Sequence, residues 1–225
     1  MKSLFRSLPI FFFLFHLGGC TSVEESSDVS ASRTGTPEPR PVPAGVTRTG
    51  EVYLLRGLAN VFSTGLDGMG AKMKARGMNV KVFNHTSWQA HANDIVARSK
   101  ERSGISNPLM IMGHSFGADD GIRMANYLGS RGIRVDYLVT FDATTRGAVG
   151  PNIGRVRNFY VDGADGVSSY RFVTAAPGFQ GDLKNTNLGK NPEHNSVHHL
   201  NIEKNAGLHD DIIQRAFSMT SRLPR

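Results

Sequence analysis

The chain has 225 residues, a length that suits one α/β or all-β domain. Apolar residues make up 39% of it and charged residues 20%, which allows a core and is too little charge for global disorder. The single cysteine excludes an internal disulfide and a multi-cysteine metal site. Although the formal net charge is +7, the lysines and arginines are scattered along the chain, so a nucleic-acid partner is not indicated.

Residues 1–19 have the composition of an export signal. A basic start precedes the apolar run Leu8–Leu17, which is too short to span about 30 Å of hydrocarbon as a helix. The segment Leu17-Gly18-Gly19-Cys20 resembles the lipobox of bacterial lipoproteins. This resemblance implies that residues 1–19 are removed and that the cysteine is acylated. The alternative is a plain secretory signal with an incidental cysteine.

Acylation of Cys20 implies a stable membrane anchor, because two or more acyl chains hold a protein where one binds only marginally. Thr21 follows the cysteine. By analogy with Gram-negative lipoproteins, this favours a location at the outer membrane, with the protein facing the periplasm. Residues 20–47 are rich in Ser and Pro and almost free of large apolar side chains, so we expect a disordered tether. The folded domain is expected over residues 48–225.

Short apolar runs alternate with helical stretches in this domain. The pattern predicts, in chain order, a strand at Val52–Leu55, a helix at Leu66–Arg76, a strand at Val80–Phe83, a helix from Thr86 or Ser87 to Ser99, a strand at Leu109–Met112, a helix at Ala118–Leu128, strands at Val135–Phe141 and Val156–Val161, and a closing helix at Asn205–Met219. Such alternation is typical of βαβ units. We therefore expect an α/β fold with a mostly parallel sheet flanked by helices.

The segment Gly113-His114-Ser115-Phe116-Gly117 matches the G-x-S-x-G pattern. The bare pattern is a weak signal in a chain with 25 glycines, but this copy lies directly between an apolar strand and an amphipathic helix. That is the setting of a nucleophile elbow, a strained strand-to-helix turn that holds a serine at the sheet edge. Ser115 is thus the candidate nucleophile, and the alternative is a structural glycine-rich turn with an ordinary serine.

A serine nucleophile requires a histidine base and a carboxylate, which follow in the order Ser, Asp or Glu, His in this setting. Asp142 stands at the carboxyl end of a predicted strand, where the active-site groups of parallel sheets collect. Asp162 and Asp165, which follow the next strand, are the rival acids.

Four histidines follow the last predicted strand. His209 falls on the closing helix, which favours a surface or helix-face role, and His194 lies further upstream. His198 and His199 lie in a loop ahead of that helix, and only one of two adjacent side chains can point into the site.

Over roughly residues 50–220 the layout resembles the α/β-hydrolase superfamily, most of all small bacterial serine hydrolases related to lipases and thioesterases. The likeness is carried by four segments: Tyr53–Leu58, Gly113–Ala118, Thr140–Ala143 and His199–Ile202. It implies that His199, rather than His198, is the base. It also implies an oxyanion hole formed by the backbone N–H groups of Leu58 and Phe116. Arg56 stands where many relatives have a histidine, and no insertion is long enough for a large lid.

These observations predict a membrane-anchored serine hydrolase that cleaves a small carboxylic ester or thioester, with Ser115, Asp142 and His199 as its triad. The chemistry needs no cofactor, and the histidines lack the spacing of a metal site. An acyltransferase or peptidase with the same triad, or an envelope lipoprotein that uses the fold for binding, are the alternatives. The sequence does not fix the oligomeric state. Four apolar residues are candidates for an acyl pocket, although such residues usually form core: Phe62, Trp88, Met112 and Phe179.

Overall fold

The computed structural model describes residues 43–58, 63–101, 104–162, 171–190 and 196–224. The predicted signal, Cys20 and most of the predicted tether lie outside these residues, as do Phe62, Asp165 and His194. Among the helices that the structure describes, none has the length and apolar character needed to cross a membrane.

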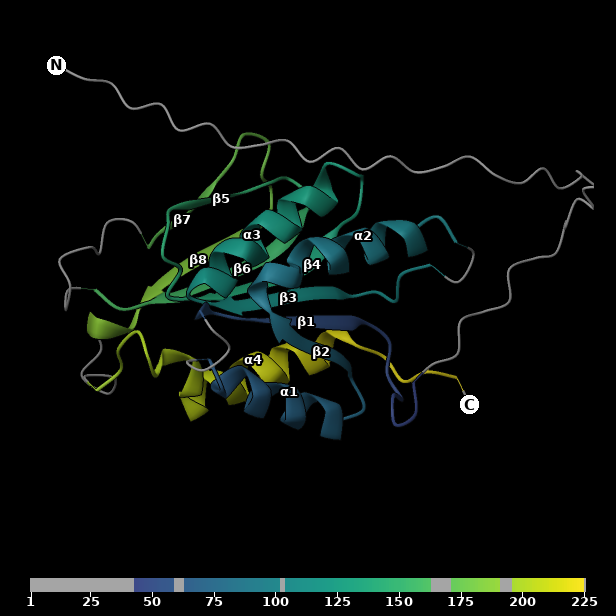
Figure 1. Cartoon of the computed structure of the whole chain (residues 1–225), viewed down its shortest axis with the longest axis horizontal. Helices are drawn as coiled ribbons and strands as arrows, with labels where there is room; N and C mark the ends of the chain where they lie inside the picture. Colours follow the sequence, from purple (N-terminus) through teal and green to yellow (C-terminus); the bar gives the residue numbers. More distant parts are fainter. Residues whose placement is uncertain (1–42, 59–62, 102–103, 163–170, 191–195, 225) are drawn as a thin grey trace, which may run out of the picture. The chain divides into compact units, whose positions relative to one another are not determined.

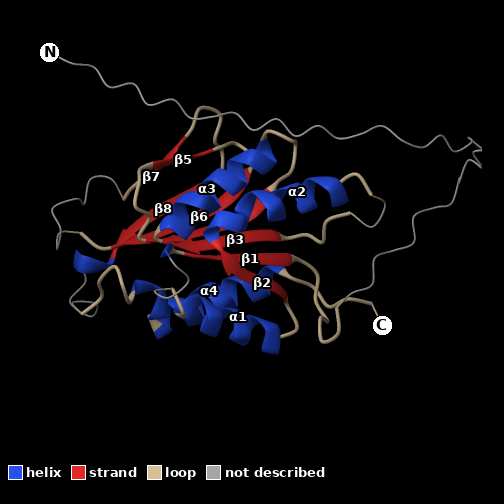
Figure 2. Ribbon diagram, in the orientation of Figure 1, coloured by secondary structure: helices blue, strands red, loops and turns tan. Residues whose placement is uncertain are grey.

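The domain is built on a six-stranded sheet with the order β2-β1-β3-β4-β6-β8. Every neighbouring pair in this sheet is parallel (Figures 1 and 2). The α/β class and the mostly parallel sheet expected from the sequence are therefore confirmed. The strands are β1 (Glu51–Arg56), β2 (Asn79–Asn84), β3 (Leu109–His114), β4 (Val135–Phe141), β6 (Ile153–Tyr160) and β8 (Asp182–Asn187).

Helices cover both faces of the sheet, as Figure 2 shows. On one face lie α1 (Gly65–Ala75) and α4 (Ala206–Met219), and on the other lie α2 (Trp88–Arg98) and α3 (Phe116–Gly129). Short 3₁₀ turns follow β2, β8 and the histidine loop: η2 (His85–Ser87), η4 (Leu188–Lys190) and η6 (Ile202–Lys204).

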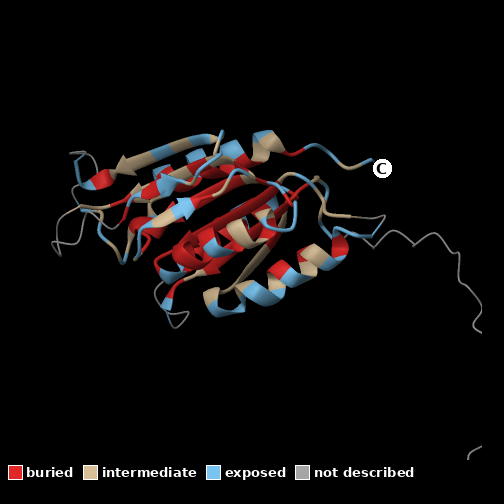
Figure 3. Ribbon diagram, turned by 90° about the horizontal axis from the view of Figure 1, so that it is seen from above, coloured by how far each residue is buried: buried red, intermediate tan, exposed pale blue. Residues whose placement is uncertain are grey.

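Side chains of the central strands alternate between two hydrophobic cores. Val52 and Leu54 of β1 pack with α1 and α4, whereas Tyr53 and Leu55 pack with α2 and α3. Because both faces are covered, β1 and β3 are buried along almost their whole length, as the colours of Figure 3 show for the middle of the sheet. A strand covered on both faces has a continuous apolar sequence, which is why these strands could be predicted.

Three strands were not predicted. The sequence of β8, Asp182–Asn187, is polar, and it can form a strand because it pairs only with β6 at the edge of the sheet. Two short strands, β5 (Gly147–Val149) and β7 (Val173–Ala175), form a separate two-stranded parallel sheet. In the chain, β5 lies between β4 and β6 and β7 lies between β6 and β8, so each belongs to a connection between strands of the large sheet.

The two ends of the described domain meet. Leu223 N–H donates to the Thr47 carbonyl at 2.9 Å, and Thr49 N–H donates to the Ser221 carbonyl at 2.8 Å. An antiparallel bridge joins Arg48 to Arg222. These contacts tie residues 47–49 to residues 221–223.

Candidate active site

Ser115 lies in a strained turn between β3 and α3. Its backbone angles are φ 57° and ψ −128°, in a region that non-glycine residues rarely adopt. The glycines on both sides are required by contact: a Cβ on Gly113 would lie 2.0 Å from the Gly117 carbonyl oxygen, and a Cβ on Gly117 would lie 2.2 Å from that of Leu55. Any residue larger than glycine at position 113 or 117 would therefore collide with the backbone.

The turn places Ser115 at the amino-terminal end of α3. Phe116 is the first helical residue, so its N–H has no acceptor within the helix, and the helix dipole makes this end positive. Ser115 itself is only 6% exposed. A negative charge that develops beside its hydroxyl would be stabilised by this arrangement.

His199 lies between Ser115 and Asp142. Its Nε2 is 3.0 Å from Ser115 Oγ, and its Nδ1 is 2.6 Å from Asp142 Oδ2. The histidine side chain is 32% exposed and the carboxylate is fully buried. The structure therefore brings together the three residues chosen from the sequence, in the order and contact that nucleophilic catalysis requires.

Asp142 follows β4 directly and also has a positive φ, 49°. Its backbone N–H donates to the Phe159 carbonyl at 2.7 Å, and Val161 N–H donates to its Oδ1 at 3.2 Å. Burial opposes ionisation, but hydrogen bonds from His199 and Arg171 outweigh it and hold the pKa of Asp142 below its usual value. The group is therefore a carboxylate at neutral pH.

The rival residues make other contacts. Asp162 accepts a hydrogen bond from Asn187 Nδ2 at 2.5 Å. His198 is exposed, and its Nδ1 accepts from Leu200 N–H at 3.2 Å. His209 belongs to α4 as predicted. The surface alternative is wrong, because the side chain is buried, and its Nε2 lies 2.5 Å from the Glu203 carbonyl oxygen.

Arg171 is a site residue that the sequence reasoning missed. Its guanidinium forms a buried ion pair with Asp142 Oδ2, and its Nη1 is 3.3 Å from His199 Nδ1. Asn158 of β6 fixes the backbone there, since its Nδ2 donates to the Arg171 carbonyl at 2.7 Å. The sequence just before Arg171 is rich in glycine and has no periodic pattern, so no signal in the sequence pointed to it.

The predicted oxyanion loop lies against the serine turn. A Cβ on Gly57 would be 3.0 Å from Ser115 Cβ, so the backbone that leads to Leu58 passes directly beside Ser115. Arg56 does not enter the site: its Nη2 is 2.5 Å from Asp67 Oδ1 of α1, and its Nε is 3.0 Å from Oδ2.

Several exposed large apolar side chains are next in the chain to residues of this site. Those of the described residues are Leu58, Phe116, Phe172 and Leu200. Each directly follows a residue described above, namely Gly57, Ser115, Arg171 and His199. We call these four side chains the apolar rim.

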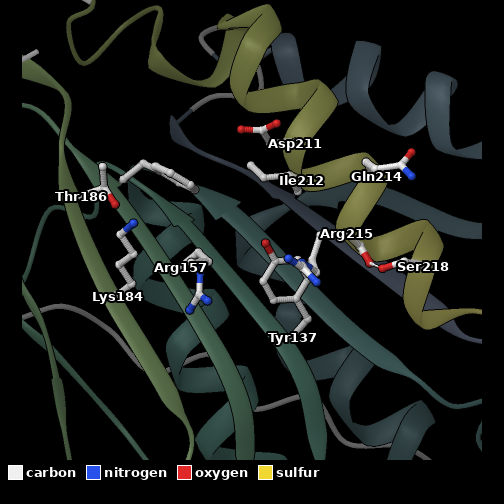
Figure 4. A pocket seen from close by; sticks show the side chains of 10 residues that line it. Tyr137, Arg157, Lys184, Thr186, Asp211, Ile212, Gln214, Arg215 and Ser218 are labelled. Atoms are coloured by element: carbon white, nitrogen blue, oxygen red, sulfur yellow. Dashed lines mark hydrogen bonds between the residues drawn. The ribbon is translucent and has the colours of Figure 1, made fainter.

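The three acyl-pocket candidates that the structure describes pack in or against the hydrophobic cores instead. Met112 is fully buried beneath α1 and α4, and Trp88 and Phe179 pack against the core on the opposite face. A groove of about 610 Å³ runs between α4 and the strands β4, β6 and β8 (Figure 4). It is lined by groups such as Tyr137, Arg157 and Arg215 and does not include the serine, the histidine or the aspartate of the site. Within the described ranges, no cluster of three or more His, Cys, Asp or Glu side chains could hold a metal ion.

The parallel sheet, the strained serine turn and the chain order Ser, Asp, His together form an arrangement of the α/β-hydrolase type. No model of a known protein family matches the chain. No curated protein matches it either.

Three solved thioesterase structures are similar to it. RedJ, from the prodiginine biosynthetic pathway of Streptomyces coelicolor, is 10% identical over 80% of this chain and 91% of its own, with a TM-score of 0.46. The NocB thioesterase domain from the nocardicin cluster is 14% identical over 76% and 95%, with a TM-score of 0.44. YbtT, a type II thioesterase from the yersiniabactin pathway, is 16% identical with a TM-score of 0.33, and the match covers 48% of this chain and 47% of YbtT.

Proposed function

We propose that the protein is a serine hydrolase that cleaves a carboxylic ester or thioester through an acyl-enzyme. The observation that carries this proposal is the chain of hydrogen bonds from Ser115 Oγ through His199 to Asp142, at a strained turn between a strand and a helix. A serine hydroxyl is a weak nucleophile, and a histidine held by a carboxylate is what activates it.

In the first half of the reaction, Ser115 Oγ attacks the acyl carbon while His199 Nε2 accepts the hydroxyl proton. The carbonyl oxygen becomes an oxyanion, which the backbone N–H groups of Phe116 and Leu58 stabilise; each such donor contributes about 2.7–4 kcal/mol. His199 then returns the proton to the leaving alcohol or thiol, and the acyl group remains on Ser115. Asp142 holds the imidazole and stabilises its protonated form.

In the second half, His199 accepts a proton from water as the water oxygen attacks the acyl-enzyme. The bond from Ser115 Oγ to the acyl carbon breaks, His199 returns the proton to Oγ, and the carboxylic acid leaves. The apolar rim supports a substrate with an apolar acyl or leaving group, because such a group would cover exposed Leu and Phe side chains beside the nucleophile.

Labelling with a fluorophosphonate probe tests the nucleophile. The wild-type protein should be labelled and should hydrolyse p-nitrophenyl esters, whereas Ser115→Ala and His199→Ala should lose both activities. Asp142→Asn should lower kcat by about 10⁴-fold, because it supplies the wrong partner for the imidazole. Asp162→Asn is the matched control and should keep full activity. Labelling that survives Ser115→Ala, or an inactive Asp162→Asn beside an active Asp142→Asn, contradicts the assignment.

We further propose that the protein is a lipoprotein of the bacterial cell envelope, anchored through Cys20 to the outer membrane and facing the periplasm. This rests on the lipobox-like segment Leu17–Cys20 and on Thr21 after it. Cys20→Ser should abolish incorporation of radiolabelled palmitate and leave the protein unprocessed or soluble. Ser22→Ala, two residues further on, should change neither property; palmitate that is still incorporated into Cys20→Ser overturns the proposal.

A further inference from the structure

His114 connects two separate loops of the site. It is the last residue of β3, it directly precedes Ser115, and it is 1% exposed. Its Nε2 is 2.8 Å from the backbone carbonyl oxygen of His199, and its Nδ1 is 2.8 Å from Ser63 Oγ. Ser63 Oγ in turn accepts a hydrogen bond from Gly57 N–H at 2.8 Å.

The chemistry of these partners fixes the direction of each hydrogen bond. A carbonyl oxygen only accepts, so His114 Nε2 must carry a proton. In a neutral ring Nδ1 is then an acceptor, and the Ser63 hydroxyl donates to it while receiving the Gly57 N–H. Every donor and acceptor in this buried chain is satisfied, and such networks specify one arrangement of the groups they join.

The ring stays neutral in the range where the site would work. Burial and the neighbouring imidazole of His199 lower the pKa of His114 to about 4. The centroids of these two rings are only 5.0 Å apart. A neutral ring keeps the same donor and the same acceptor while the base beside it gains and loses a proton.

Each arm of the chain ends at a group to which the proposed function gives a role. One arm ends on the backbone of His199, the base. The other ends on Gly57, which precedes Leu58, the second oxyanion donor. No hydrogen bond is described between the His114 ring and Ser115 Oγ, so the ring acts on the site through these two loops.

We propose that His114 is a positioning residue, a neutral imidazole that holds the base and the oxyanion loop in fixed relation about Ser115. This inference rests on the proposed function of the site. A displacement of about 1 Å at a reacting group can cost 10²-fold in rate, which sets the size of the expected effect.

The test compares three variants on a p-nitrophenyl ester, well below the melting temperature of each. His114→Leu removes both arms and should lower kcat about 10²-fold, with KM changed less than about threefold, because positioning rather than substrate affinity is lost. His114→Gln keeps one N–H donor and one carbonyl acceptor. Its kcat should be at least about tenfold higher than that of His114→Leu. Ser63→Ala cuts only the arm to Gly57 and should give an intermediate kcat.

Nitrogen-15 NMR of the wild-type protein supplies a readout apart from activity, and should show a neutral His114 ring protonated at Nε2 from pH 5 to 8. A ring protonated at Nδ1 overturns the proposal. So does a His114→Leu variant with wild-type kcat, or a His114→Gln variant as slow as His114→Leu. If His114→Leu does not fold, the other two variants decide. The proposal is then overturned when Ser63→Ala has the wild-type kcat and His114→Gln is slow. If the fluorophosphonate probe does not label Ser115 of the wild-type protein, the proposed function is refuted. The NMR result then still decides whether the hydrogen bonds of His114 have the proposed directions.

Discussion

At the scale of single residues, backbone strain coincides with the candidate site. In the part of the chain that the structure describes, Ser115 and Asp142 are the non-glycine residues with positive φ, at 57° and 49°. Such conformations cost of order 1–3 kcal/mol each and persist only where the surroundings enforce them. Here the close backbone approach at Gly113 and Gly117 enforces the first of them. The candidate nucleophile Ser115 and the candidate acid Asp142 are therefore held by the fold at a cost to its stability.

Replacing Ser115 by glycine should release part of this strain. Glycine adopts φ 57° without steric cost, and this gain should exceed its larger loss of chain entropy. We expect Ser115→Gly to be more stable than Ser115→Ala by about 1 kcal/mol, measured by urea denaturation. Ser130, at φ −64°, is the control: there the glycine variant should be the less stable of the two. Finding alanine superior at both positions would show that the turn is not strained.

At the scale of elements, the four helices and five strands of the large sheet could be predicted from the sequence, whereas its edge strand β8 could not. Val52–Leu55 and Leu109–Met112 are apolar because helices cover both faces of the sheet there. By contrast, Asp182–Asn187 forms β8 through pairing with β6 alone, and its sequence has no strand pattern. Ser115 could be located because a strained turn restricts its neighbours to glycine. Arg171 reaches the site from a loop, and loops impose no periodicity on the sequence.

A buried ion pair joins α2 to β1. Arg98 Nη1 is 2.6 Å from Glu51 Oε1, and Tyr53 Oη donates to Oε2 at 2.6 Å. Burial opposes ionisation of Glu51, but hydrogen bonds from Arg98 and Tyr53 hold its pKa below the usual value. Removal of one partner should therefore leave an uncompensated buried charge.

We expect Arg98→Met to destabilise the protein by about 3–5 kcal/mol, measured by urea denaturation. Arg134→Met, which removes an exposed ion pair with Asp136, is the control and should cost at most about 1 kcal/mol. The double variant Glu51→Leu with Arg98→Met should recover part of the loss, because no charge is then buried. Equal costs for the two arginine variants would contradict the role given to the pair.

At the scale of the whole molecule, the free energy of unfolding depends on pH through buried carboxyl groups. Some of these groups stabilise the fold more at high pH, and another stabilises it more at low pH. The pKa values of Asp142 and Glu51 are lowered by hydrogen bonding, which outweighs burial, so their contribution is present above the unfolded pKa of about 4 and is lost as pH falls through the folded values. Burial raises the pKa of Glu203, next to α4. The contribution of Glu203 to the free energy of unfolding is therefore present below its pKa in the unfolded chain. It is lost as pH rises through its pKa in the folded protein.

Glu203→Gln should therefore become relatively more stable as pH increases. The difference in melting temperature between this variant and the wild-type protein should grow in favour of the variant from pH 4 to pH 8, because only the wild type has to ionise a buried group. Differential scanning calorimetry across this range measures it. Asp211→Asn, at an exposed position of α4, is the control and should show a nearly constant difference. A constant difference for Glu203→Gln as well would contradict the prediction.

The meeting of the two domain ends has a practical consequence. Thr47 and Leu223 are hydrogen-bonded beside the amino-terminal end of β1, whereas Ser115 follows the carboxyl end of the neighbouring parallel strand β3. Both ends of the described domain thus lie near the amino-terminal ends of the strands, opposite to Ser115. We therefore expect that a fusion partner, tag or surface attached at residue 47 or 223 leaves the candidate site uncovered. A circular permutant that joins residues 47 and 223 by a short linker should keep the same sheet, since the closure replaces contacts that are already adjacent.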